Sequence, residues 1–169
     1  MKSLRQQLVS LALKWQKLYG VAPHITSALS EVDAAKLIGM KKAAYSRFMI
    51  KEERSQVAEG FDFKFKEIRY QVKANRPSGK KGSKVTVVSN IKTKLKKNNE
   101  SAWDKLIWIL YDSNYEIQEA WRWDRVDFEE QFKEQLSMEK NYVLMTCEKG
   151  KNSGKNALPL TVTLSGFWR

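Results

Sequence analysis

The chain has 169 residues, of which 42% are hydrophobic and 30% charged, so we expect one folded domain spanning 1–169 with a substantial core. No apolar run approaches the roughly 18 residues of a membrane span, and we expect no membrane association. Cys147 and His24 are the only residues of their types, which excludes an internal disulfide and a multi-histidine zinc centre. The cysteine usage favours a cytoplasmic location.

The net charge of +12 is unevenly spread along the chain. Residues 1–60 contribute +5, residues 61–100 contribute +9, and residues 101–169 contribute −2. A localised basic segment is typical of proteins that bind a phosphate backbone. The alternative for the same segment is a solvated lysine loop that keeps the protein soluble.

Helical patterns fill the N-terminal part, 1–58. Apolar residues at spacings of three and four predict an amphipathic helix over 3–19, with Ser3 as its cap and Gly20 after its end. The residues that form this apolar pattern are Leu4, Leu8, Leu11, Trp15 and Leu18. A second helix is predicted from about 25 or 30 to 38, and residues 40–58 are predicted to be helical or irregular.

Strand patterns dominate the middle part, 60–123, where the apolar period changes to two. The expected strands are 61–65, 68–74, a short one at 85–88, a buried one at 103–111 and its hairpin partner at 115–123. Residues 75–84 are predicted to be a loop, and 91–100 a short helix or a mobile arm.

The C-terminal part, 124–169, is predicted to hold a helix over 126–138, a loop over 148–156 and a last strand over 158–164. Helices followed by strands, a helix and a strand indicate an α/β (α+β) fold with a central mixed β-sheet flanked by helices. The four tryptophans of this region are expected in the core or in hairpin packing: Trp103, Trp108, Trp121 and Trp123.

Three polar residues on the first two strands form the candidate site. Gln71 and Lys73 are two residues apart on a strand and therefore project from the same face. A hairpin that closes near 66–67 would bring Asp62 beside Gln71. Glu67 is a competing ligand that we expect at the turn.

Carboxylate and amide oxygens are the hard ligands that Mg²⁺ or Mn²⁺ prefers. Such a metal polarises a phosphodiester and lowers the pKa of bound water. A nearby lysine stabilises the negative charge that develops or positions the water.

The motifs Gly60-Phe61-Asp62 and Tyr70-Gln71-Val72-Lys73, with Glu31 on a preceding helix, resemble the restriction-endonuclease-like fold of the PD-(D/E)XK nuclease superfamily. The resemblance spans residues 30–111 and departs from the family pattern at two points. Phe61 stands where the family has proline, and Gln71 where it has Glu or Asp.

The resemblance implies a role for each of these residues. Asp62 would be the first metal ligand, Gln71 would occupy the acidic position, and Lys73 would be the catalytic lysine. Glu31 would be the helix carboxylate, with Asp33 as its substitute.

These features predict a metal-dependent endonuclease of the restriction or repair type that hydrolyses double-stranded DNA. A homodimer would suit a duplex substrate, because a duplex has two strands. The expected nucleic-acid contacts are Arg76, Lys80, Lys81, Lys84, Lys92 and Lys94.

Two other function classes remain open. The first is a non-catalytic nucleic-acid-binding module, either a nuclease-like fold without activity or a helix-turn-helix over 30–49. The second is a protein–protein module, such as an inhibitor or adaptor in a defence system. Metal-dependent cleavage distinguishes the enzyme from the binder, and salt-dependent DNA affinity distinguishes both from the adaptor.

Overall fold

A computed structural model describes residues 2–51, 60–77, 85–89, 103–137, 142–146 and 157–160. Three helices come first along the chain: α1 (Leu4–Tyr19), α2 (Thr26–Leu37) and α3 (Lys42–Lys51). The later elements are β1 (Phe63–Phe65), β2 (Ile68–Asn75), β3 (Val85–Ser89), β4 (Lys105–Tyr111), β5 (Ile117–Asp124), α4 (Arg125–Gln131), α5 (Lys133–Ser137), β6 (Tyr142–Thr146) and β7 (Leu158–Pro159).

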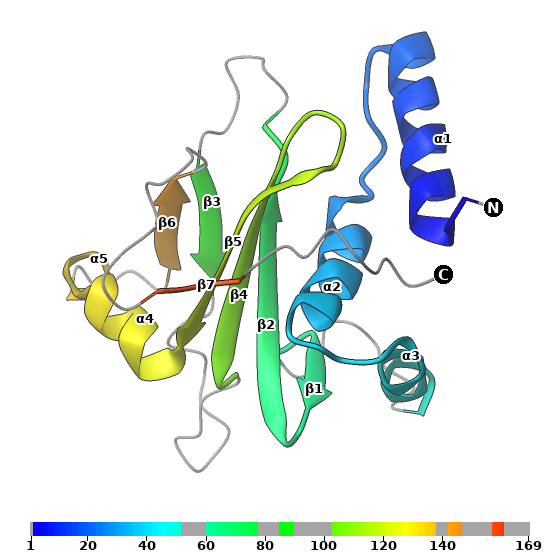
Figure 1. The fold of residues 1–169 in the computed structure, drawn as a ribbon. Helices are drawn as coiled ribbons and strands as arrows, with labels where there is room; N and C mark the ends of the chain where they lie inside the picture. The colour runs from blue at the N-terminus through cyan, green and yellow to red at the C-terminus, as the bar shows by residue number, and fades with distance from the viewer. Residues whose placement is uncertain are drawn as a thin grey trace.

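The main sheet has the strand order β1-β2-β4-β5-β7 within the described ranges. Strands β2 and β4 run parallel, and the other neighbours are antiparallel. Helices α2 and α3 lie on one side of this sheet, and α4, α5 and the small β3–β6 sheet lie on the other (Figure 1). The α+β class and the mixed sheet flanked by helices are thus confirmed.

The strand β4 explains where the core lies. Its residues from Leu106 to Tyr111 are all buried, because both faces of the strand are covered. One face packs with Trp103, Trp123 and Phe128, and the other packs with residues of α2. The buried positions of Trp103, Trp108 and Trp123 confirm that these side chains belong to the core.

Helix α1 has well-formed ends but a wide exposed surface. Ser3 and Gln6 form a capping box, and Gly20 ends the helix in the left-handed region at φ 73°. Val9 and Ala12 pack towards the body of the protein. The apolar residues that predicted the helix point outwards instead, with Leu4 81%, Leu11 65%, Trp15 51% and Leu18 76% exposed.

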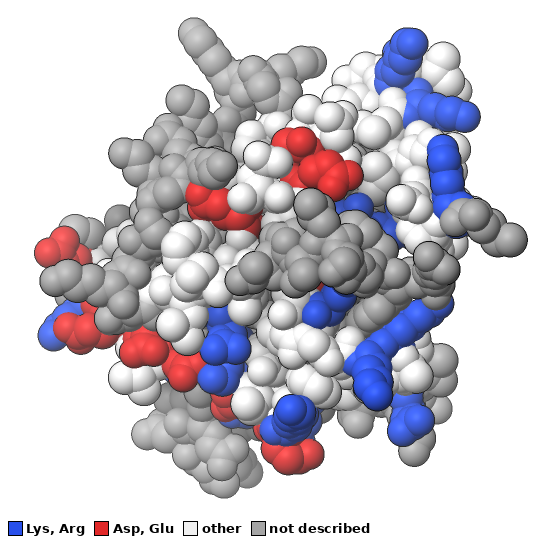
Figure 2. Space-filling model, viewed as in Figure 1, with Lys and Arg blue, Asp and Glu red and all other residues white. Residues whose placement is uncertain are grey.

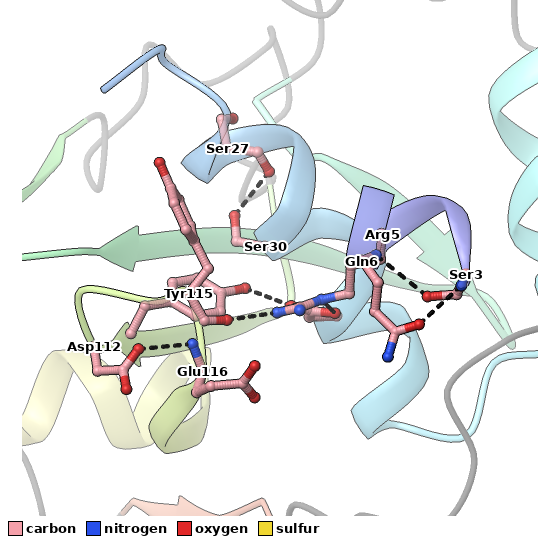
Figure 3. Close-up of polar contacts among 10 residues, drawn as sticks. Ser3, Arg5, Gln6, Ser27, Ser30, Asp112, Tyr115 and Glu116 are labelled. Atoms are coloured by element: carbon pink, nitrogen blue, oxygen red, sulfur yellow. Dashed lines mark hydrogen bonds and ion pairs between the residues drawn. The ribbon is translucent and has the colours of Figure 1, made fainter. Parts of the chain in front are cut away.

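A buried ion pair ties α1 to the rest of the domain. Arg5 donates through Nε and Nη2 to the Asp33 carboxylate, at 2.9 and 2.8 Å, and Asp33 is 3% exposed. The Tyr111 hydroxyl also donates to Asp33, at 2.8 Å. Figure 3 shows Arg5 reaching on to the Tyr115 carbonyl, 2.8 Å away. Burial and the Asp33 charge raise the pKa of Tyr111 well above its usual range.

The structure differs from the sequence expectations at several elements. The predicted helix over 126–138 is divided into α4 and α5 around Phe132. Tyr115, expected in a strand, lies instead in the turn before β5 with φ 63°, and it is buried against α1. Strand β6 was not predicted at all. The predicted segment 91–100 and most of the predicted last strand lie outside the described residues.

None of the helices in the described part of the chain combines the length and the apolar character that a membrane crossing requires.

Candidate active site

A tight hairpin between β1 and β2 builds the candidate site. Lys66 and Glu67 occupy the turn in the left-handed region, at φ 49° and 65°, as a two-residue hairpin loop requires. The strands pair in the register Phe63 opposite Tyr70, and the Asp62 amide donates to the Tyr70 carbonyl at 2.8 Å. The prediction that this turn brings Asp62 beside Gln71 is confirmed.

The Asp62 carboxylate binds the neighbouring strand directly. Its Oδ2 accepts from the Val72 amide at 2.6 Å and from Gln71 Nε2 at 2.8 Å. Because β1 begins at Phe63, the Val72 amide lies beyond the part of β2 that pairs with β1. The Asp62 carboxylate therefore serves as the hydrogen-bond acceptor of this amide. The contact fixes Asp62 at the sheet edge and orients the Gln71 amide.

Glu31 reaches the same edge from α2. Its carboxylate accepts from Ser27 Oγ at 3.4 Å and from the Tyr45 hydroxyl at 3.5 Å. Burial and the nearby negative charge of Asp62 raise the pKa of Glu31 to about 7. Two carboxylates are therefore held close enough to repel each other.

Tyr45 is the site residue that sequence reasoning missed. Its ring packs edge-on against Phe63, with the two ring centroids 6.0 Å apart. Its hydroxyl, however, faces Glu31, and burial together with Glu31 and Asp62 raises its pKa. The available signal was the polar tip of a tyrosine on an otherwise apolar helix face, because buried tyrosines need a hydrogen-bond partner.

Lys73 lies on β2 two residues beyond Gln71. Gln71 pairs with Leu106 and Lys73 with Trp108, which both belong to the core cluster on the α4 side of the sheet. The two polar side chains therefore share one face of β2, as predicted. Within the described ranges, Lys73 makes no hydrogen bond or ion pair with Asp62, Gln71 or Glu31.

The remaining sequence candidates are placed elsewhere. Glu67 is 90% exposed and pairs with Lys64 in the turn, so it does not compete with Gln71. Asp33 cannot substitute for Glu31, because it is buried in its contacts with Arg5 and Tyr111. Lys80, Lys81, Lys84, Lys92 and Lys94 lie outside the described residues.

Arg76 makes contacts within the chain. Its guanidinium donates to the Ser113 carbonyl and to Gln16 Oε1, the latter at 2.8 Å, and lies 4.1 Å from the Tyr115 ring centroid. These contacts join the end of β2 to α1 and to the β4–β5 turn. Its phosphate-binding role stays a prediction.

The candidate donors come from two sides of the sheet, because Glu31 lies on α2 whereas Gln71 faces the α4 side. Across the described ranges no group of three or more His, Cys, Asp and Glu side chains is arranged to bind a metal, so the candidate site offers two carboxylates and one amide. The Gln71 Nε2–H group donates a hydrogen bond to Asp62 Oδ2, so the side-chain carbonyl oxygen of Gln71 is the atom that could serve as a hard ligand. Mg²⁺ binds through one or two carboxylates and retains several waters, which fits this set.

No protein-family model matches the chain, and no curated protein matches it at a significant level. The nuclease reading of the site therefore depends on the residues described above.

We expect Glu31→Gln to remove a pH dependence from the stability of the protein. In the folded state Glu31 stays protonated up to pH 7, whereas in the unfolded chain it ionises near its ordinary pKa of 4.5. The folded state therefore binds more protons over this window, and stability falls as pH rises from about 4.5 to about 7. Because Glu31 is partly exposed, solvent screening limits this loss of folding stability to about 1–2 kcal/mol above pH 7.

Urea denaturation at pH 5 and pH 8 measures this effect. Glu31→Gln should be more stable than the parent chain at pH 8 and close to it at pH 5. The exposed Glu116→Gln serves as the control and should follow the parent chain. Equal pH dependence in the parent and in Glu31→Gln would contradict the placement of Glu31 beside Asp62.

Proposed function

We propose that this protein is a metal-dependent endonuclease that hydrolyses phosphodiester bonds in DNA, on a restriction-endonuclease-like arrangement of its sheet. The observation that carries the proposal is the meeting of Asp62 and Gln71 at the sheet edge, where Asp62 Oδ2 accepts a hydrogen bond from Gln71 Nε2 at 2.8 Å. Glu31 lies near this edge, and burial, followed by the negative charge of Asp62, raises its pKa to about 7. Two carboxylates kept close at a sheet edge repel each other, and a divalent cation between them removes the repulsion.

Each side chain has a defined role in this proposal. Asp62, Glu31 and the Gln71 carbonyl would hold Mg²⁺ or Mn²⁺, which when bound supplies polarisation of the phosphate and an activated water. The Lys73 ammonium, on the same strand face as Gln71, would offset negative charge on the phosphate. Tyr45 holds the Glu31 carboxylate in place through a hydrogen bond that its hydroxyl group donates.

Charge supports a nucleic-acid partner. On the face shown in Figure 2, Lys and Arg gather over α1 and towards α3, while Asp and Glu lie over α4 and α5 and also over the end of the β4–β5 hairpin. The acidic residues of α4 and α5 include Asp127, Glu129, Glu130 and Glu134. A polyanion such as double-stranded DNA would therefore approach from the side of the N-terminal helices.

One observation favours a second function, a nuclease-like module that binds DNA without cleaving it. The Asp62 carboxylate already accepts two hydrogen bonds, from the Val72 amide and Gln71. Part of the hydrogen-bonding capacity of Asp62 is thus already used within the protein. The neutral Gln71 side chain adds no negative charge that would attract a metal ion. The helix-turn-helix alternative has less support, since α2 packs Ala34 and Ala35 into the core against the sheet.

Plasmid cleavage with Mg²⁺ or Mn²⁺ tests the enzyme. We expect the parent chain to nick or cut DNA, and Asp62→Ala and Lys73→Met to lower the rate by about 100-fold or more. Lys64→Met is the matched control, because Lys64 lies on the neighbouring strand and pairs with Glu67 rather than with the site. Its rate should stay within about twofold of the parent rate.

Two results would overturn this assignment. Cleavage that survives in both Asp62→Ala and Lys73→Met would place the activity elsewhere. Salt-dependent DNA binding by the parent chain, with no cleavage in either metal, would establish the non-catalytic binder instead.

A further inference from the structure

We propose that the side-chain amide of Asn75 binds the phosphate next to the one that is cut, and so fixes the position of the DNA backbone along β2. This binding role rests on the proposed function, in which the Lys73 ammonium offsets negative charge on the scissile phosphate. It adds a substrate-binding residue to the candidate site, two residues beyond Lys73 on the same strand.

Asn75 and Lys73 lie on one face of β2, because residues two apart on a strand project from the same side. Lys73 pairs with Trp108, and Asn75 pairs with Leu110. Both partners on β4 belong to the core cluster on the α4 side of the sheet. Two residues of a strand span about 6.6 Å, so Asn75 meets the backbone one step further along β2 than Lys73 does.

A hydrogen bond from a buried tryptophan fixes the direction in which the Asn75 amide points. Trp108 is 0% exposed, and its Nε1 donates to Asn75 Oδ1 at 3.0 Å. An indole nitrogen only donates, so the amide oxygen faces Trp108 and the amide nitrogen points away from it. The oxygen is thus used inside the protein, whereas the two N–H groups of Nδ2 are directed elsewhere.

Two donors on this face have no acceptor within the described part of the chain. Neither the Lys73 ammonium nor Asn75 Nδ2 donates a hydrogen bond there, and Lys73 forms no ion pair. Asparagine is depleted in strands, and a carboxylate would accept the Trp108 hydrogen bond equally well. What the amide adds is a pair of N–H donors without a negative charge, and a phosphate oxygen accepts from such donors.

The edge of the sheet is open beside these two residues. Strand β1 pairs with β2 only as far as Tyr70. Further along β2, none of the described strands pairs on this outer side. Lys73 and Asn75 are both partly exposed. A phosphate backbone that approaches from the edge can therefore reach both side chains.

A contact to a neighbouring phosphate affects binding more than chemistry. Phosphate contacts set the position of a protein on the duplex and carry no sequence information. The charge of the neighbouring phosphate does not change during the reaction, so the contact stabilises the ground state and the transition state equally. Its loss therefore raises KM and leaves kcat unchanged. Because the amide is neutral, its contact also releases no counterion, in contrast to the contact of Lys73.

Asn75→Asp tests the amide directly. The new carboxylate keeps an acceptor for Trp108 and puts a negative charge where the two N–H donors were. With plasmid DNA and Mg²⁺, we expect KM to rise about thirtyfold or more and kcat to stay within about twofold of the parent value. Gln118→Glu is the matched control, because it adds the same charge at an exposed glutamine of β5, and it should leave both constants unchanged.

Asn75→Ala is the second variant, and DNA binding across a salt series separates a phosphate contact from a structural role. Binding is measured in EDTA by fluorescence anisotropy of a labelled duplex. Asn75→Ala should weaken binding about tenfold at each salt concentration, and the slope of log Kd against log salt should stay that of the parent chain. Lys73→Met should reduce this slope by about 1. Far-UV circular dichroism checks that each variant is folded.

The outcomes separate this binding role from the proposed function. If the parent chain cuts DNA and Asn75→Asp cuts it with an unchanged KM, the binding role is wrong and the enzyme stands. A salt slope reduced in Asn75→Ala as in Lys73→Met would mean that Asn75 only supports the strand. If the parent chain binds DNA without cutting it, weaker binding by Asn75→Ala supports the contact, and equal binding overturns it. A parent chain that neither binds nor cuts DNA overturns both proposals.

Discussion

Replacing Asp33 by alanine is expected to lower the free energy of unfolding by about 3–5 kcal/mol, because it leaves a charged guanidinium and a hydroxyl without their shared acceptor. Asp33 is 3% exposed and receives hydrogen bonds from Arg5 at 2.8 Å and from Tyr111 at 2.8 Å. These partners come from α1 and β4, so the loss loosens contacts across the domain rather than at one helix. Urea denaturation followed by tryptophan fluorescence measures the change.

Asp124→Ala is the comparison for this result. Asp124 pairs with Lys105 at 2.6 Å, but its side chain is 50% exposed, so its removal should cost about 1 kcal/mol or less. The double variant Arg5→Met with Asp33→Ala should recover part of the loss, because no unpaired charge remains. If Asp33→Ala and Asp124→Ala cost the same, the Arg5–Asp33 pair does not support the fold as described.

We expect Gln71→Glu to destabilise the protein without metal and to stabilise it when metal is present. Without metal, it replaces a hydrogen bond to Asp62 by a third carboxylate beside Asp62 and Glu31, and it should destabilise the protein by about 1–3 kcal/mol. With Mn²⁺, the added charge should tighten metal binding by about tenfold or more, so that thermal stability rises above that of the parent chain. Differential scanning fluorimetry in EDTA and in Mn²⁺ gives both values.

The control for this prediction is Gln118→Glu, an exposed glutamine on β5 outside the site. It should show the same stability in EDTA and in Mn²⁺ as the parent chain. If Mn²⁺ changes the stability of Gln71→Glu no more than that of Gln118→Glu, the site does not hold a metal. DNA binding without metal would then be the remaining function.

The hairpin of the candidate site was predictable because it is local. Asp62 and Gln71 are nine residues apart, and the change of apolar period with a polar turn between them is enough to bring them together. The same kind of signal predicted β4, since an uninterrupted apolar run is typical of a strand buried on both faces.

For contacts between residues that are distant in the sequence, no local sequence pattern gave a comparable signal. Glu31 and Asp33 lie two residues apart on α2, yet one faces the site and the other a buried ion pair. The side of α2 that becomes buried depends on Arg5 and Tyr111, and Tyr111 is 78 residues from Asp33 along the chain. The outward position of the apolar side of α1 is unpredictable for the same reason, because an amphipathic pattern does not say which side of a helix meets the domain.

The parallel pairing of β2 with β4 affects how the chain can change over evolution. A parallel pair needs a long crossover, here the segment between Asn75 and Lys105, whereas the β1–β2 hairpin closes without it. Doubling the length of such a connection costs only about 0.6 kcal/mol in closure entropy. Insertions there would leave Asp62 and Gln71 in place. Insertions in the crossover that keep the pairing of β3 with β6 can therefore add new recognition elements at little cost to the fold.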